Sequence, residues 1–270
     1  MTAWQLWSTG WDWEPSVVMG CAALVMGYWA IARKHGLSRM NYWLAGVVVL
    51  LLDLVSPIDA LGDQYLFSAH IFQHFLLALI IPPLLLFGTP RWLAEVALQR
   101  PSLRKAERIL GHPPVSWLLG VGTMLAWHIP VFFNAALAND TLHIFQHLSF
   151  LVTGTIFWWP IVGPLEDRHL PPLGAVSYLF SACLCCSLLG AFLTFGPVGL
   201  YPAYLNPSPA FGDNLGIVRL VRENWGLDPK SDQQLGGLLM WVPGCFVYLS
   251  GILSTVMHWY GAADSEGRPV

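Results

Sequence analysis

Long apolar segments separated by short polar ones run through the whole chain. Each of these segments is close to the length of about twenty residues that a helix needs to cross a bilayer. We predict spans at 16–32, 41–57, 66–87, 115–133, 142–162, 173–195 and 235–256. Prolines and glycines at or near the segment ends are typical helix stops, whereas Pro82 and Pro83 lie inside the third segment and should kink or shorten it. The pattern predicts an all-α, polytopic membrane bundle of about seven helices that forms one domain over residues 1–270.

The composition supports a bilayer as the solvent. Charged residues make up 11% of the chain and hydrophobic residues 55%, whereas soluble domains have roughly 25% charged residues. The net charge of -3 leaves no basic face for a nucleic acid. Asp12 and Glu14 precede the first apolar segment without a basic stretch, so we expect no cleaved signal there.

Basic residues predict the orientation. Most of them lie in segments on one side of the predicted membrane, and a smaller group lies in the long loop 196–234 on the other side. The positive-inside rule places the larger group in the cytoplasm, which puts the N-terminus outside and the C-terminus inside. The larger group comprises Arg33, Lys34, Arg39, Arg91, Arg100, Arg104, Lys105, Arg108, Arg168 and Arg268, and the smaller one Arg219, Arg222 and Lys230.

Two pairs of histidines are the clearest chemical signal. His70 and His74 are four residues apart at the start of the third predicted span, and His143 and His147 repeat that spacing at the start of the fifth. Residues i and i+4 share one face of a helix, where two imidazoles can bind one ion. Both spans run inward in the predicted topology, so both pairs lie in the outer leaflet.

Three further residues are predicted to lie at the same depth. These are His128 and Asp53, near the outer ends of the fourth and second spans, and Met240, near the outer start of the seventh. Ionisable groups inside a membrane are costly and usually functional. Packing explains most lone buried histidines, but a layer of five predicts a metal site. Asp53 could be a ligand, an acceptor for a histidine N–H or a polar packing group, and Met240 is the weakest candidate.

The donor types narrow the choice of metal. Imidazole suits zinc, copper, iron and nickel, and a nearby methionine favours Cu(I). Haem competes, but it takes one ligand from each side of its ring and would use only one histidine of each pair. The pattern does not favour a metalloprotease, because neither pair contains the glutamate of H-E-x-x-H. We therefore expect copper ahead of zinc or haem.

The pentapeptide His-Ile-Phe-Gln-His occurs twice, at 70–74 and at 143–147. A polar residue close to a proline precedes each copy: Asp53 with Pro57, and His128 with Pro130. The pattern predicts an internal duplication with two parallel copies, and chance similarity of apolar segments is the alternative. The histidine pairs would then face each other across a pseudo-two-fold axis.

Two segments lie outside this pattern. The loop 196–234 is long enough to be a lid or a partner contact, with disorder as the alternative, and its Tyr201, Tyr204 and Trp225 suit the membrane interface. The sixth span contains three cysteines that either bind Cu(I) or pack as small residues, and we favour packing. They are Cys183, Cys185 and Cys186.

Several segments resemble a known family. They include YLFSAHIFQHFLLALIIPPLLLFGTP (65–90), LHIFQHLSFLVTGTIFWWPIVGP (142–164) and DQQLGGLLMWVPG (232–244). They are similar to the CtaG family of multi-span cytochrome c oxidase assembly factors, and the resemblance extends from about residue 53 to the last span. Gln146 departs from the acidic residue that relatives often have there.

The resemblance implies a role in building a haem–copper oxidase in the bacterial plasma membrane. The chain would bind copper at the periplasmic side through the same five histidines and deliver it to oxidase subunits, without enzymatic turnover. The recipient, the number of ions and the oligomeric state are left open. The alternatives are an accessory structural subunit of an oxidase, a redox protein with haem or a di-metal centre, and a copper transporter.

Overall fold

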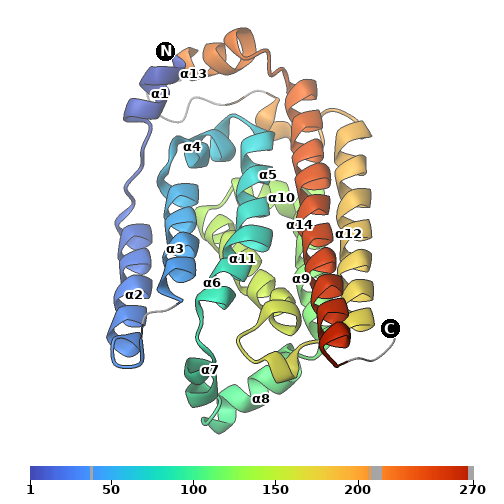
Figure 1. The fold of residues 1–270 in the computed structure, drawn as a ribbon. Helices are drawn as coiled ribbons and strands as arrows, with labels where there is room; N and C mark the ends of the chain where they lie inside the picture. The colour runs from blue at the N-terminus through green and yellow to red at the C-terminus, as the bar shows by residue number, and fades with distance from the viewer. Residues whose placement is uncertain (37–38, 206, 208–214, 267–270) are drawn as a thin grey trace.

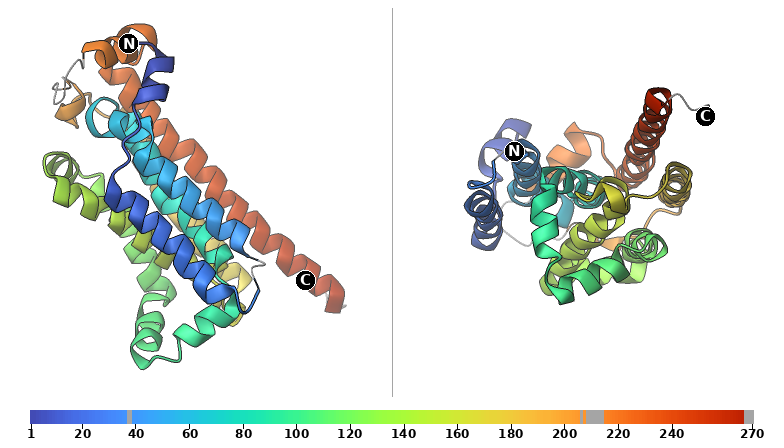
Figure 2. Two further views of the ribbon diagram at one scale, coloured as in Figure 1. Left: turned by 90° about the vertical axis from the view of Figure 1, so that its left-hand side faces the viewer. Right: turned by 60° about the horizontal axis from the view of Figure 1, so that its bottom comes forward.

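The computed structural model describes residues 1–36, 39–205, 207 and 215–266, and every regular element within these ranges is helical (Figure 1). Arg268 and residues 206 and 208–214 of the long loop lie outside them. Long helices run side by side as a bundle (Figure 2). They are α2 (Pro15–Ala32), α3 (Met40–Val55), α5 (Phe67–Phe75) with α6 (Ile81–Gly88), α9 (Pro113–Trp127), α11 (Asp140–Val162), α12 (Pro172–Phe195) and α14 (Pro229–Glu266).

Each predicted span coincides with one of these helices, which confirms the all-helical membrane bundle. Among the described residues, four helices are long and apolar enough to cross a membrane: Pro15–Ala32, Phe67–Gly88, Pro172–Phe195 and Pro229–Gly261. The number is six if each of two bent helix pairs forms one span. The helix α11 has 23 residues, a length of about 35 Å. The count of seven and the orientation stay predictions.

Short helices lie across the two ends of the bundle (Figure 1). We call one end the site end; it holds α1 (Ala3–Thr9), α4 (Pro57–Gln64), α10 (Pro130–Leu137), the 3-10 turn η3 (Pro202–Tyr204), and α13 (Leu215–Arg219) with the π-helical η4 (Leu220–Asn224). The opposite end holds α7 (Arg91–Ala97), α8 (Pro101–Leu110) and the 3-10 turn η2 (Glu166–Arg168).

The predicted end of the fourth span, at 133, is wrong. The helix α9 ends at Trp127, and a new helix, α10, begins at Pro130. Proline lacks a backbone N–H and its ring clashes with the preceding turn, so it starts a helix more readily than it continues one. The same chemistry ends α3 at Val55 and begins α4 at Pro57, after a bend of 50°.

The prolines at 82 and 83 do not shorten the third span. Five residues of π-helix, Leu76–Ile80, join α5 to α6, and the two prolines occupy the first turn of α6. The π segment changes the hydrogen-bonding register ahead of the prolines, where their missing N–H groups would otherwise interrupt the helix. The apolar segment therefore continues to Gly88.

Glycines let the long helices approach closely. A Cβ atom at Gly237 of α14 would lie 2.5 Å from the Thr194 backbone nitrogen of α12, and one at Gly190 would lie 2.9 Å from the Gly237 carbonyl oxygen. A Cβ at Gly154 of α11 would lie 2.8 Å from the Ala78 carbonyl oxygen. Small residues at such crossings are characteristic of membrane helix packing.

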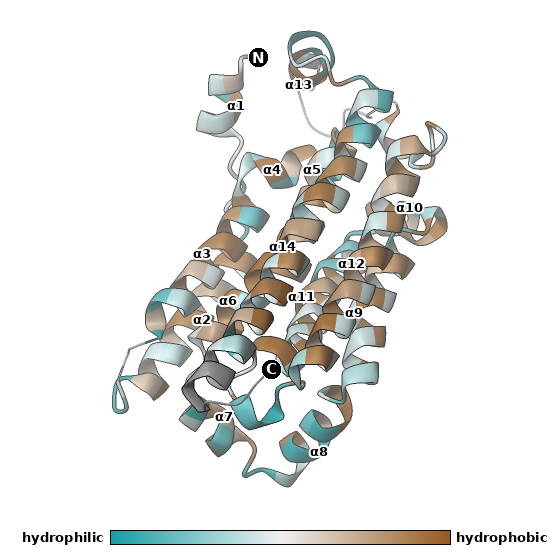
Figure 3. Ribbon diagram, turned by 45° about the vertical axis from the view of Figure 1, so that its right-hand side comes forward, coloured by the Kyte–Doolittle hydropathy of each residue, from teal (hydrophilic) through white to brown (hydrophobic). Residues whose placement is uncertain are grey.

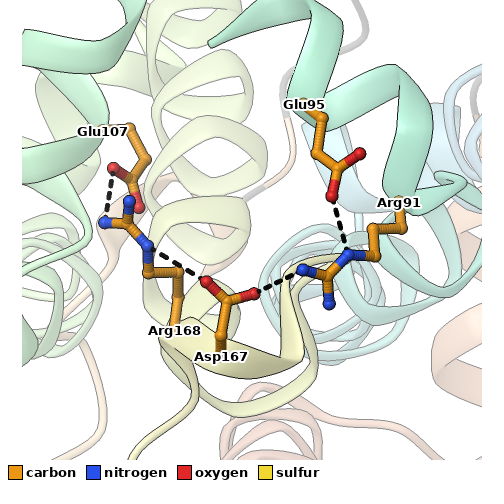
Figure 4. Close-up of polar contacts among 5 residues, drawn as sticks. All are labelled: Arg91, Glu95, Glu107, Asp167 and Arg168. Carbon is orange, nitrogen blue, oxygen red and sulfur yellow. Dashed lines mark hydrogen bonds and ion pairs between the residues drawn. The ribbon is translucent and has the colours of Figure 1, made fainter.

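Hydrophobic residues follow the long helices, and hydrophilic ones gather at the helix ends and on α8 (Figure 3). At the opposite end, exposed ion pairs connect α7, α8 and η2 (Figure 4). Arg91 contacts Glu95 at 2.8 Å and Asp167 at 3.0 Å, and Arg168 contacts Asp167 at 3.6 Å and Glu107 at 3.4 Å. Exposed pairs contribute little individually, but this chain of contacts joins three separate segments.

Candidate metal centre

The structure brings all five predicted histidines together. The α5 pair lies against the α11 pair, with ring centroids 5.2 Å apart for His70 and His143 and 5.7 Å apart for His74 and His147. His128 lies at the C-terminal end of α9, and its ring centroid is 5.5 Å from that of His74. Three helices thus place five imidazoles in one layer at the site end.

Most ring nitrogens of these imidazoles are buried and have no hydrogen-bond partner among the described residues. His70, His74 and His128 are at most 2% exposed. Within the described part of the chain, seven ring nitrogens have no partner: both in His70 and His74, and Nε2 in the other three histidines. A buried polar atom without a partner costs about 1–3 kcal/mol, so a cluster of them needs an explanation.

Neighbouring groups hold the rings in place. The Met124 carbonyl oxygen lies 2.6 Å from Nδ1 of His128, so this ring presents Nε2 to the cluster. The Phe150 ring packs against the His74 ring, with centroids 4.3 Å apart, and the Phe133 ring packs against the His70 ring, with centroids 4.9 Å apart. Second contacts of this kind orient metal-binding histidines.

Two sets of side chains could each hold a metal ion in the described part of the chain. Within each set, the potential ligand atoms all lie within 4.8 Å of one another. The first comprises His70, His74 and His147, all buried, and the second comprises Asp63, His70 and His143. Asp63 lies on α4, and its Oδ1 is 3.5 Å from Nε2 of His143. Asp63 was not among the predicted site residues, although Asp59 and Asp63 share the i, i+4 spacing of the histidine pairs.

Asp53 and Met240 differ from the five histidines. Asp53 is buried on α3 and belongs to neither of the two ligand groups found among the described residues. Its carbonyl oxygen accepts a hydrogen bond from the Gln73 amide, which also donates to Asp59 at 2.8 Å. Met240 lies in the apolar core, where its carbonyl oxygen accepts a hydrogen bond from the Cys186 thiol at 3.3 Å.

A carboxylate from another helix caps the first turn of α5. Asp232 on α14 is fully buried and accepts hydrogen bonds from the Phe67 and Ser68 backbone N–H groups at 2.8 and 3.0 Å. These N–H groups have no partner inside the helix, since the first four donors of any helix lack one. Asp232 therefore fixes the start of the helix, three residues before His70.

The loop between α12 and α14 covers the cluster, so the interface role predicted for two of its tyrosines is wrong. Tyr201 and Tyr204 are each 3% exposed. Their hydroxyls donate to the carbonyl oxygens of His128 and Gly62, at 2.8 and 2.7 Å. Burial raises the pKa of both hydroxyls, so they remain donors at neutral pH. Trp225 is partly exposed, at 36%.

The cysteines lie between α12 and α14. The Cys183 and Cys245 sulfur atoms are 3.4 Å apart, and the Ser187 hydroxyl is 3.1 Å from the Cys245 sulfur. Gly244 of α14 also faces Cys186, and a Cβ there would lie 3.0 Å from the Cys186 sulfur. These contacts fit the packing role.

The two histidine pairs occur in equivalent settings. In each half a long helix is followed by an eight-residue helix that begins with proline, α4 or α10, and then by a helix whose first turns hold the HIFQH sequence. The first histidine follows that proline by 13 residues in both halves. This order supports the predicted duplication.

The donor set fits a metal ion such as copper or zinc. Ligand atoms around a tetrahedral ion with bonds of about 2.0 Å are separated by about 3.3 Å. The imidazole nitrogens of His70, His74 and His147 are already within 4.8 Å, so a small closure would place them around one ion. A haem between the two helices would have to separate the α5 histidines from the α11 histidines, whose rings now lie side by side.

Comparison with known proteins agrees with this geometry. A model of the cytochrome c oxidase caa3 assembly factor family matches residues 22–262. The chain belongs to this family. It is 26% identical to uncharacterised proteins of Mycobacterium leprae, Mycobacterium bovis and Mycobacterium tuberculosis, in alignments that cover 92% of this chain.

The chain spans about two fifths of these relatives, since the alignments cover 39% of each. No solved structure matches the chain. Family membership together with the apolar helices identifies a membrane protein whose family assists the assembly of cytochrome c oxidase.

Proposed function

We propose that the chain binds a copper ion among its buried histidines and delivers it to a cytochrome c oxidase subunit at the periplasmic face of the bacterial plasma membrane. His70, His74 and His147 are the central ligands, and His128 and His143 lie beside them. The observation that supports the proposal is the set of seven buried ring nitrogens with no hydrogen-bond partner among the described residues. The transferred ion is a cargo, so no enzymatic turnover is required.

A structural role alone explains the cluster less well. Histidines that only pack would pair their nitrogens with carbonyl oxygens, as His169 does with the Gly163 carbonyl at 2.8 Å. Within the cluster only His128 has such a bond. Neutral imidazoles have a free lone pair on one nitrogen, and a metal ion offsets the desolvation of several at once.

The position of the cluster also suits delivery. It lies at the site end, beneath a loop, which is the predicted periplasmic face. A partner that binds this end would meet the loop first and the ion directly below it. Buried copper is thereby protected from water while remaining within one helical turn or two of the surface.

The test is the metal content of the detergent-purified protein after growth in copper, measured by mass spectrometry. We expect one ion in the wild type, none in the folded variant His70→Ala/His143→Ala, and one in the control His258→Ala, which removes an exposed histidine of α14. Metal-free wild type that still co-purifies with an oxidase would favour the accessory subunit instead.

Delivery needs a separate measurement. The copper content of the recipient oxidase is compared in cells that express the wild type or the double variant. We expect copper-deficient oxidase with the variant. Normal oxidase copper beside a metal-free variant would refute delivery while leaving the binding site intact.

A further inference from the structure

We infer that the centre has a second, outer position for the ion, formed by the Asp63 carboxylate with His70 and His143, through which the ion enters and leaves. This inference rests on the proposed function and deepens it. Potential ligand atoms of these three residues lie within 4.8 Å of one another. Asp63 Oδ1 and His143 Nε2 are 3.5 Å apart, which is too long for a hydrogen bond and suits an ion between them.

The inner position is the one formed by His70, His74 and His147. The side chains of the outer position are more exposed than those of the inner one. The side chain of His143 is 15% exposed and that of Asp63 is 33% exposed, whereas His70 is fully buried. His70 belongs to both groups and has two nitrogens without partners in the described part of the chain. An ion from outside therefore meets Asp63 first and reaches His74 last.

The fold holds Asp63 firmly at this place. At the neighbouring Gly62, a Cβ atom would lie 3.1 Å from the backbone nitrogen and from the Cα of His70, so α4 contacts α5 through glycine. The Tyr204 hydroxyl donates to the Gly62 carbonyl oxygen, and Asp59 on the same helix accepts from the Gln73 amide. These contacts fix α4 relative to the histidine pair on α5.

Ligand exchange can then move the ion without a redox step. The ion keeps its bond to His70, exchanges Asp63 and His143 for His74 and His147, and reverses this exchange on release. A carboxylate is a harder ligand than imidazole and holds Cu(I) less tightly, so the outer position is the weaker one. One shared imidazole allows one ion at a time, in either position.

The variants separate the two positions. Asp63→Asn removes the outer charge with little change of shape, and His74→Ala removes the inner position, with His74→Gln in its place if the alanine variant does not fold. The control Glu223→Gln removes an exposed carboxylate of η4, also at the site end, that pairs with Arg219. The probe is Cu(I), titrated against a chromogenic chelator, with the rate of copper removal measured by the same chelator.

We expect wild type and Glu223→Gln to bind one ion with equal affinity and release rate. Asp63→Asn should retain the affinity but release copper about tenfold more slowly, and His74→Ala should bind one ion more weakly. Adding Asp63→Asn to His74→Ala should lower the affinity by a further factor of about ten.

Three outcomes would overturn the outer position. They are an unchanged release rate in Asp63→Asn, equal affinities of His74→Ala with and without Asp63→Asn, and complete loss of copper in a folded His74 variant. A wild type that binds no copper would instead refute the proposed function.

Discussion

The cap that α14 provides for α5 leads to a sharp prediction. Replacing Asp232 by alanine removes the acceptor of two backbone hydrogen bonds, from Phe67 and Ser68, in a fully buried place. Water cannot easily replace the lost oxygen atoms there. The first turn of α5 should loosen, and with it the position of His70.

The magnitude follows from the two orphaned donors. Each buried N–H without a partner costs about 1–3 kcal/mol, and part of this cost is offset because a buried charge disappears. We therefore expect Asp232→Ala to lower the free energy of unfolding by about 2–4 kcal/mol. Asp232→Asn keeps one acceptor oxygen and should cost about 1–2 kcal/mol. A matched control exists in Asp228→Ala, because the Asp228 carboxylate also accepts two backbone hydrogen bonds, from Lys230 and Ser231.

The assay is thermal unfolding in detergent, followed by tryptophan fluorescence, together with Cu(I) affinity. Asp228 is exposed, so water can replace its oxygen atoms and its loss should lower the unfolding temperature less. We expect the order wild type, Asp228→Ala, Asp232→Asn, Asp232→Ala, with weakened copper binding only in the Asp232 variants. Equal unfolding temperatures for Asp232→Ala and Asp228→Ala would refute the reasoning.

Three further predictions follow from the packing and the site. Gly237→Ala should destabilise the protein by about 1–3 kcal/mol because the new Cβ would clash between α12 and α14. Gly20→Ala on α2, where a Cβ meets nothing within 4 Å, should not destabilise the protein, and equal unfolding temperatures of the two variants would contradict this. Tyr204→Phe leaves the Gly62 carbonyl oxygen without its donor and should speed hydrogen exchange in α4, by mass spectrometry, with exchange in α12 as the unchanged reference. Copper affinity should fall as the pH is lowered because a protonated imidazole has no lone pair for the ion, and an affinity that stays constant down to the pH at which the protein unfolds would count against imidazole ligands.

Sequence patterns predict the long helices well and the short ones poorly. Apolar segments of the right length mark α2, α11 and α12, whose starts agree with prediction within two residues. The helices α4 and α10 have only eight residues each, and both begin at a proline that also marks the end of a span. Their existence depends on packing across the site end, which no local pattern specifies.

The sequence predicts the height of each site residue along the bundle, but it does not predict the rotation of each helix about its axis. Helix direction and distance from the helix end give the height of a residue in the bundle, and this placed the five histidines correctly in one layer. The height of Asp53 was derived in the same way, yet its backbone lies beside Gln73 and its carboxylate is in neither ligand group of the described chain. Rotation about the helix axis decides which neighbour a residue meets, and it depends on tertiary packing.

The tyrosines and Asp63 illustrate the same limit. Tyr201 and Tyr204 have the composition of interface residues, but the loop turns inward and buries both hydroxyls. Asp63 lies on a helix that the pattern did not predict, so its approach to His143 could not be derived. The i, i+4 spacing of Asp59 and Asp63 just before a histidine pair was the available signal.

The parallel course of α5 and α11 has an energetic consequence. Their first turns meet at the histidines, and Gly154 packs on Ala78 further along, so the two helices run in the same direction. Parallel halves present their ligands at one face of the bundle. In the proposed function the ion is therefore taken up and released at that same face. Such an ion does not cross the membrane potential, so its binding and release would not depend on that potential.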